Sequence, residues 1–207
     1  EIAKGISGRS NQLPWVISKT YFPIFVARWL RGVTGKSILD YGSAEGIMMW
    51  FLKTFGAKVT GVEVNPSRKA YSDRILDLPD VSCDPGFLDL DSNQNRFDSV
   101  ISFHTLEHVF DLDRTLQGMA QVLKPGGLMI IAVPNNDVGG THTIGLEPDY
   151  FRRALPRHGM EIEKVSWNND DLEAEFRLNG KGLPVWSSMD DLLDDLRMSR
   201  ALSLDLR

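Results

Sequence analysis

The segment 37–46 constrains the fold more than any other part of the chain, and it reads Ser-Ile-Leu-Asp-Tyr-Gly-Ser-Ala-Glu-Gly. A short apolar run ends in an acid, Asp40, and small residues then occupy every second position. These small residues are Gly42, Ala44 and Gly46. A second apolar run follows directly, over residues 47–52. The order predicts a strand, a tight turn that brings bare backbone close to a ligand, and a helix whose N-terminus faces that ligand.

The composition is that of a globular domain with a sizeable core. The chain has 207 residues, of which 42% are apolar and 25% are charged, and these values are ordinary for one domain. Most of the net charge of −5 falls in residues 168–207, so no basic footprint predicts a nucleic-acid partner. No apolar run approaches the ~20 residues that span a bilayer, and we expect no membrane partner. The single Cys83 suits a reducing compartment, so we expect a cytoplasmic protein.

Strand-like and helix-like segments alternate from residue 37 onward. The expected strands are residues 38–40, 58–63, either 81–83 or 86–88, 97–103, 128–133, 160–167 and 172–178. The expected helices are residues 67–76, one capped by Asp111 or Asp113, and 147–157. This alternation predicts an α/β fold with a doubly wound, mostly parallel seven-stranded sheet. The last two strands are close in sequence, so they should form an antiparallel C-terminal hairpin.

The chain divides into three expected parts. Residues 1–36 form an N-terminal helical segment whose aromatic side chains dock on the core, with a role as a lid as the alternative. Residues 37–180 form the core domain, and residues 181–207 form an acidic helical tail. The oligomeric state is open, and a dimer is one possibility.

Two classes of ligand compete for a strand, a glycine turn and a helix. Dinucleotide sites have glycines in the pattern Gly-x-Gly-x-x-Gly, but Ile47 stands where the third glycine would be. Glu45, in the middle of the turn, would also repel a pyrophosphate. A ligand with a charged amino-acid moiety and no phosphate fits better, since Asp40 can hold its ammonium group. Glu63 ends the second strand and can accept hydrogen bonds from two ribose hydroxyls in either class of ligand.

Six short motifs follow one another along the chain and carry a family resemblance. They are Asp40-Tyr41-Gly42-Ser43-Ala44-Glu45-Gly46, Gly61-Val62-Glu63, Phe97-Asp98, Leu106-Glu107-His108-Val109, Leu123-Lys124-Pro125-Gly126-Gly127 and Pro134-Asn135. With them, residues 38–167 resemble the class I S-adenosylmethionine-dependent methyltransferases, and the last three motifs are similar to the ubiquinone-pathway-like branch of small-molecule O-methyltransferases. The resemblance implies a Rossmann-like fold, S-adenosylmethionine as cofactor, and methyl transfer to an oxygen of a small molecule. A catalytically inactive binding or partner protein of the same fold is the alternative.

The resemblance also assigns the residues that hold the cofactor. They are Asp40, Gly42, Ala44, Gly46, Glu63, Leu88, Asp89 and Phe103. Asp89, beside the apolar Leu88, is expected to meet the adenine amino group, and Asp84 is the alternative. Ala44 replaces the middle glycine of the family pattern. Its methyl group is tolerable beside a ligand only if its φ is negative, so we expect a negative φ.

The histidines are the candidates for the chemistry. Methyl transfer from a sulfonium needs alignment above all, and a general base only for an acceptor with a high pKa. His104 follows the fourth strand and is the first candidate base, with a structural role as the alternative. His142 lies in a glycine- and threonine-rich loop and is a second candidate for contact with the substrate. His108 is interpreted as fixing its loop, with proton transfer or metal binding as alternatives. The four histidines and one cysteine show no zinc-type spacing, so we expect no metal.

Overall fold

The computed structural model describes residues 26–27, 30, 32–134, 140, 142, 144–162 and 171–172. The strands are β1 (Ser37–Tyr41), β2 (Lys58–Val62), β3 (Val81–Ser82), β4 (Phe97–Phe103), β5 (Leu123–Pro134) and β6 (Asp171–Leu172). The helices are α3 (Ile47–Thr54), α4 (Pro66–Ile75), α5 (Leu112–Val122) and α6 (Pro148–Arg157). Short 3₁₀ turns are η1 (Phe87–Asp89), η2 (Asp91–Asn93) and η3 (Leu106–His108). The expected N-terminal helical segment and acidic tail lie outside the described residues, apart from a few positions between 26 and 36.

The expected α/β sheet is confirmed. The strand order is β3-β2-β1-β4-β5-β6, in which β1 to β5 run parallel and β6 pairs antiparallel with β5. The seventh strand and the hairpin are not confirmed. Residues 160–162 form no strand, and residues 163–170 and 173–178 lie outside the described part of the chain.

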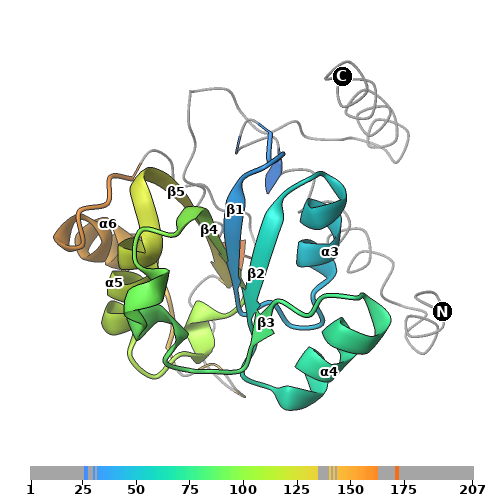
Figure 1. Ribbon diagram of the computed structural model, residues 1–207. Helices are drawn as coiled ribbons and strands as arrows, with labels where there is room; N and C mark the ends of the chain where they lie inside the picture. Colours follow the sequence, from blue (N-terminus) through green and yellow to red (C-terminus); the bar gives the residue numbers. More distant parts are fainter. Residues whose placement is uncertain are drawn as a thin grey trace, which may run out of the picture.

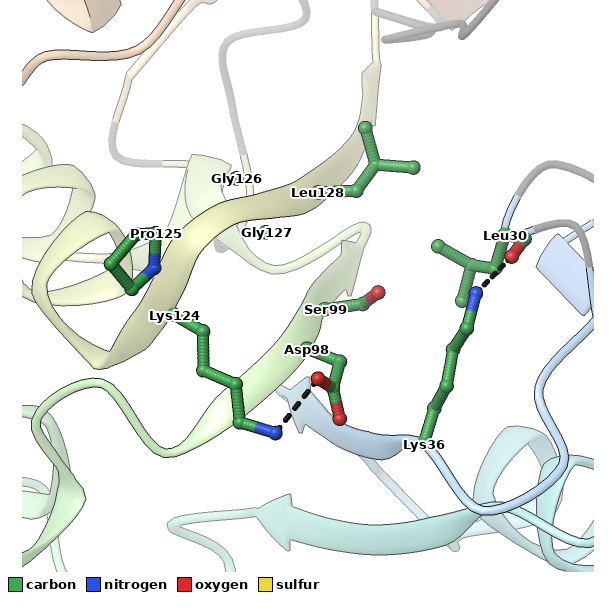
Figure 2. Close-up of a pocket in the computed structure, with 9 residues that line it drawn as sticks. All are labelled: Leu30, Lys36, Asp98, Ser99, Lys124, Pro125, Gly126, Gly127 and Leu128. Atoms are coloured by element: carbon green, nitrogen blue, oxygen red, sulfur yellow. Dashed lines mark hydrogen bonds and ion pairs between the residues drawn. The ribbon is translucent and has the colours of Figure 1, made fainter.

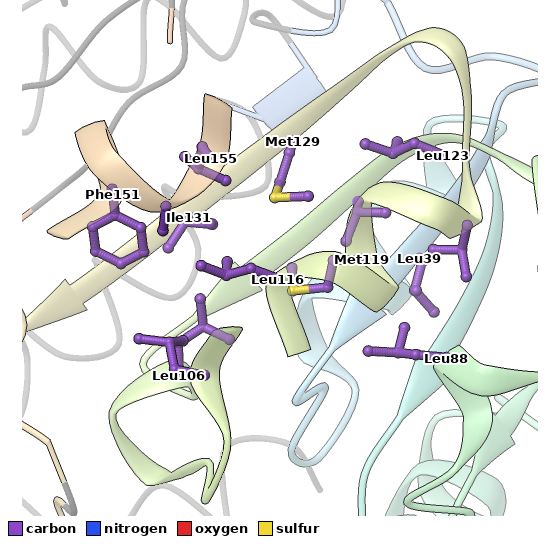
Figure 3. Packing of buried hydrophobic residues seen from close by; sticks show 14 of the residues in the cluster. Leu39, Leu88, Leu106, Leu116, Met119, Leu123, Met129, Ile131, Phe151 and Leu155 are labelled. Atoms are coloured by element: carbon purple, nitrogen blue, oxygen red, sulfur yellow. The ribbon is translucent and has the colours of Figure 1, made fainter. Parts of the chain in front are cut away.

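Helices cover both faces of the sheet, with α3 and α4 on one face and α5 and α6 on the other (Figure 1). Two neighbouring residues of β1 show why both faces of the sheet need a helical cover. Ile38 and Leu39 are both fully buried, but Ile38 belongs to the cluster under α3 and Leu39 to the cluster under α5. The second cluster contains Leu116, Met119, Met129 and Phe151 (Figure 3). A strand that is apolar on both faces is what a sheet with two helical layers requires.

Two side chains set the starts of helices, and the sequence predicts the second of them. The side chain of Asn65 accepts the N–H of Ser67 at 2.9 Å, and Pro66 opens α4. Asp111 accepts the N–H of Arg114 at 3.0 Å, which decides between the two expected caps of α5. Asp113 instead accepts hydrogen bonds from Arg157 and His158, at the end of α6.

The start of β5 differs from expectation. The sequence predicts a glycine stop after α5 and a strand that begins at residue 128, but β5 begins at Leu123. Leu123 pairs with Phe97 and the next pair joins Ser99 to Leu128, so residues 124–127 bulge out of the strand. Gly127 permits this bulge, because a Cβ there would lie 2.8 Å from the carbonyl oxygen of Lys124.

One carboxylate joins three strands at their amino ends. Asp98 accepts the N–H of Ser37 at 2.8 Å and the ammonium group of Lys124 at 2.7 Å. The hydrogen bonds from Lys124 and Ser37 lower the pKa of Asp98. The same carboxylate lines a cavity of about 270 Å³ with Lys36, Lys124 and Leu128 (Figure 2). This cavity opens at the sheet edge opposite the glycine turn, so we assign it to packing and not to the ligand.

The substitution Asp98→Asn should lower the free energy of unfolding by about 1 kcal/mol at pH 7, since the pair with Lys124 is partly screened by solvent. The pKa of Asp98 is depressed in the folded protein, so its contribution is present above the pKa of the unfolded chain. That contribution is lost as the pH falls through the lower folded value. Urea unfolding at pH 7 and pH 3 measures both effects. An equal deficit at both pH values, or the same deficit in the exposed control Asp80→Asn, contradicts this role.

Candidate active site

The strand order reverses between β1 and β4. The chain crosses from β1 to β2 on one side and returns through β4 on the other, so the connections diverge at this point (Figure 1). Ligands of open α/β sheets bind at such a point, beyond the carboxyl ends of the strands. The turn 42–46 follows β1 there, and His104 and Thr105 follow β4. The site expected from the sequence therefore stands at the topological switch point.

Contacts within the protein require glycine at two positions of the turn. Gly42 has a φ of +84°, and a Cβ there would lie 2.0 Å from the hydroxyl oxygen of Thr105. Gly46 has a φ of +81° and precedes α3, and a Cβ there would lie 2.9 Å from side-chain atoms of Leu78 and Ser72. The small residues thus bring the loops after β1 and β4 together, in addition to leaving backbone open toward a ligand.

The expected negative φ of Ala44 is wrong. Its φ is +49°, in the left-handed region, where an L-residue is less stable by about 1–2 kcal/mol. The N–H of Ala44 donates to Oε2 of Glu63 at 3.0 Å. This hydrogen bond holds the turn in its conformation despite the alanine side chain.

Glu63 connects the turn to the second crossover. Its Oε1 accepts the N–H of Asn65 at 2.8 Å while Oε2 accepts that of Ala44, and the residue is 7% exposed. A carboxylate has about four acceptor positions, and these two hydrogen bonds use two of them. Arg68 lies 4.0 Å from Oε2 of Glu63 and 3.6 Å from Oε1 of Glu45. Arg68 partly offsets the charge of Glu45, so repulsion of phosphates by Glu45 is weaker than the sequence suggests.

Asp40 is the last but one residue of β1, which lies between two other strands. It is 3% exposed, and its backbone lies in register with Gly61 of β2 and Ile101 of β4. A carboxylate buried at this point favours a cationic group nearby. The structure therefore brings together five of the expected cofactor residues: Asp40, Gly42, Ala44, Gly46 and Glu63.

The residues expected near adenine have other contacts. Leu88 is 5% exposed and packs beneath Gly118 of α5. Asp89 accepts a hydrogen bond from Arg114 at 2.7 Å, and Asp84 accepts the N–H of Gly86 at 2.8 Å. Each carboxylate is engaged with protein, so the choice between them remains a prediction. Phe103 is half-buried at the end of β4.

The phenol of Tyr41 stays neutral next to this site. Burial raises the pKa of Tyr41, a hydrogen bond with Thr115 opposes that shift, and the charge of Asp89 adds to it. The ring packs against the cluster under α5. Tyr41, which is bulkier than the turn requires, therefore serves packing.

Three histidines that are scattered in the sequence gather around one acid. His104 has a φ of +50° and its side chain is 44% exposed, with Nδ1 3.8 Å from Oε1 of Glu107. Nε2 of His108 lies 3.7 Å from the same oxygen, and the rings of His108 and His142 are 4.9 Å apart. The sequence motif pointed to Glu107 and His108, but the approach of His142 is a tertiary contact without a local signal. The fourth histidine, His158, lies 3.2 Å from Asp113.

Comparison with protein families identifies residues 20–182 as a match to the model described as "Methyltransferase domain". The chain belongs to this methyltransferase family. It is 29% identical over 166 residues to the ubiquinone biosynthesis O-methyltransferase of Nitrobacter winogradskyi, a match that covers 79% of this chain and 63% of that protein. It is 30% identical over 140 residues to the enzyme of the same name from a Bradyrhizobium species, covering 67% and 55%. The chain thus spans somewhat more than half the length of these relatives.

Solved structures share the fold. The [4+2]-cyclase SpnF has a TM-score of 0.62 at 22% identity, covering 70% of this chain and 59% of that chain. A phosphoethanolamine N-methyltransferase of Haemonchus contortus, solved with S-adenosyl-L-methionine, has a TM-score of 0.57 at 22% identity, covering 68% and 36%. At these identities the likeness supports the fold alone. Among the described residues, no helix combines the length and apolarity needed to cross a bilayer.

The left-handed conformation of Ala44 predicts opposite effects at two neighbouring positions. Ala44→Gly removes the backbone strain but adds freedom to the unfolded chain, and should stabilise the protein by about 0.5–1 kcal/mol. That corresponds to a rise in Tm of about 2 °C for a chain of this size. Gly46→Ala, at a φ of +81° and with contacts at 2.9 Å, should lower Tm by several degrees. Calorimetric scans of both variants check the geometry, and a lower Tm for Ala44→Gly contradicts it.

Proposed function

We propose that the chain transfers the methyl group of S-adenosylmethionine to an oxygen atom of a small molecule. The observation that carries this proposal is the turn at the switch point, where a buried acid, two obligatory glycines and the Glu63 carboxylate gather. Membership of the methyltransferase family supports the reaction class. The relatives named as O-methyltransferases support oxygen as the acceptor.

Each part of the cofactor has a place in this arrangement. Asp40 holds the ammonium group of the methionine moiety through its buried charge, and Glu63 accepts the ribose hydroxyls with its two remaining acceptor positions. Gly42, Ala44 and Gly46 present backbone to the ligand. Adenine binds beyond β3, with Phe103 nearby, the apolar Leu88 beside the ring, and Asp89, or alternatively Asp84, at the amino group.

The reaction is a displacement at the methyl carbon. The acceptor oxygen forms the new C–O bond as the S–C bond breaks. The electron pair of the S–C bond goes to sulfur, and the hydroxyl proton of the acceptor passes to a base. Most of the rate comes from holding the two reactants in line. His104 is the proposed base, because it follows β4 at the switch point and its imidazole is partly exposed. His142 contacts the acceptor from the loop after β5.

The composition supports two further parts of this proposal, the class of the acceptor and the cellular compartment. The neutral balance of residues 1–167 argues for a small molecule as acceptor in place of nucleic acid. The single cysteine argues for the cytoplasm.

Calorimetric titration with S-adenosylmethionine tests the cofactor site. Glu63→Gln should weaken binding at least tenfold, or about 1.4 kcal/mol, because an amide replaces a charged acceptor of ribose hydroxyls. The matched control is Glu161→Gln, at an exposed position after α6, which should bind like the unaltered protein. If the unaltered chain binds neither S-adenosylmethionine nor its demethylated product at millimolar concentration, the inactive binding protein becomes the better interpretation.

The base is tested by the rate of S-adenosylhomocysteine formation with a panel of phenols and catechols. His104→Ala should reduce turnover by about 10²-fold or more, with little effect on cofactor affinity. Unchanged turnover in His104→Ala excludes this histidine as the base and leaves the cofactor site standing.

A further inference from the structure

We propose that Glu45 is a positioning residue that keeps the carboxylate of Glu63 open to the ribose of the cofactor. It does so by holding the guanidinium group of Arg68 away from Glu63. This inference rests on the proposed function and deepens it. It also gives a role to the acid that stands in the middle of the glycine turn.

Arg68 lies between two acids. Its Nε is 3.6 Å from Oε1 of Glu45, and its Nη1 is 4.0 Å from Oε2 of Glu63. A close guanidinium–carboxylate pair has N···O distances of about 2.7–2.9 Å, so Arg68 closes on neither acid. The Arg68 side chain is 51% exposed and has room to move, whereas hydrogen bonds from the N–H groups of Ala44 and Asn65 fix the carboxylate of Glu63.

The two distances to Arg68 differ from what burial alone predicts. Opposite charges attract each other more strongly in a buried, low-dielectric environment than in water. Arg68 should therefore approach Glu63, whose side chain is 8% exposed, more closely than Glu45, whose side chain is 38% exposed. The structure shows the opposite order, with the shorter distance to Glu45. Glu45 thus offsets the attraction of Arg68 to Glu63 and keeps the two groups apart.

Glu45 and Arg68 face each other because α4 packs on the glycine turn. Ser72 lies one helical turn after Arg68, and its hydroxyl donates to the carbonyl oxygen of Arg68 at 3.2 Å. Residues four positions apart share one face of a helix. On this face Ser72 lies against Gly46, where a Cβ would come within 2.9 Å of the hydroxyl oxygen. Since Glu45 directly precedes Gly46, this contact brings Glu45 within reach of Arg68.

The distance of Arg68 matters because Arg68 and a ribose hydroxyl compete for the same oxygen. Oε2 of Glu63 already accepts the N–H of Ala44 at 3.0 Å. A carboxylate oxygen has about two acceptor positions, so a close Arg68 would take the second one. When Glu45 holds Arg68 at its present distance, a ribose hydroxyl can take that position instead. The acid in the turn therefore serves ribose binding.

Calorimetric titration with S-adenosylhomocysteine tests this role, because this ligand carries no sulfonium charge and responds little to the net charge of the site. Glu45→Gln keeps the shape of the side chain and removes its charge. It should weaken binding about three- to fivefold, the size of a coupling between partly exposed charges. In a chain that already carries Arg68→Gln, the same substitution should change the affinity by less than about twofold. Arg74→Gln, at an exposed position of the same helix, is the matched control background, in which Glu45→Gln should still weaken binding.

The analogue of S-adenosylhomocysteine that lacks both ribose hydroxyls gives a second measurement. Nothing in this ligand competes with Arg68 for Glu63, so Glu45→Gln should affect its affinity much less. A general disturbance of the turn would weaken both ligands equally, and that result overturns the proposal. Circular dichroism and Tm establish that each variant is folded.

The outcomes separate the role of Glu45 from the proposed function. Unchanged binding in Glu45→Gln, or an equal loss in the Arg68→Gln background, overturns the role of Glu45 and leaves the cofactor site standing. A loss that disappears with Arg68→Gln and with the analogue supports the role. If the unaltered chain binds neither S-adenosylmethionine nor S-adenosylhomocysteine, the proposed function is overturned, and the role of Glu45 with it.

Discussion

The carboxylate of Glu63 is the contact on which the candidate site depends. It accepts one N–H from the turn after β1 and one from the start of the crossover after β2, and it is almost completely buried. Together with the backbone hydrogen bonds from Ser43 to Val62 and from Gly46 to Ser43, it holds Ala44 in the left-handed region. The Glu63 side chain thus links the loop after β1 to the loop after β2. This link lies at the switch point of the sheet, where ligands of open α/β sheets bind.

Polar side chains gather at both ends of the parallel strands, but their contacts differ. At the amino edge, Asp98 links the starts of β1, β4 and β5 through two close hydrogen bonds. At the carboxyl edge, His104 and His108 lie 3.8 and 3.7 Å from one oxygen of Glu107. The Phe97-Asp98 and Lys124 motifs of the family thereby acquire a structural role distinct from the glycine turn.

Local patterns in the sequence predict most of this fold. The cap at Asp111, the apolar run of β4 and the acid–glycine turn all depend on neighbours a few residues away. What the sequence does not predict depends on tertiary contacts. The φ of Ala44 follows from Glu63, 19 residues later, and the early start of β5 follows from the pairing of Leu123 with Phe97. The meeting of His108 and His142 requires the whole β4–β5 unit.

The packing of Thr105 on Gly42 means that the loop after β1 and the loop after β4 are in direct contact. In the proposed function, the first loop binds the cofactor and the second faces the acceptor. A larger side chain at either position would push the loop after β4 away from the loop after β1. Under the proposed function, a substitution at Thr105 that altered the preference for the acceptor would therefore also disturb the turn that binds the cofactor.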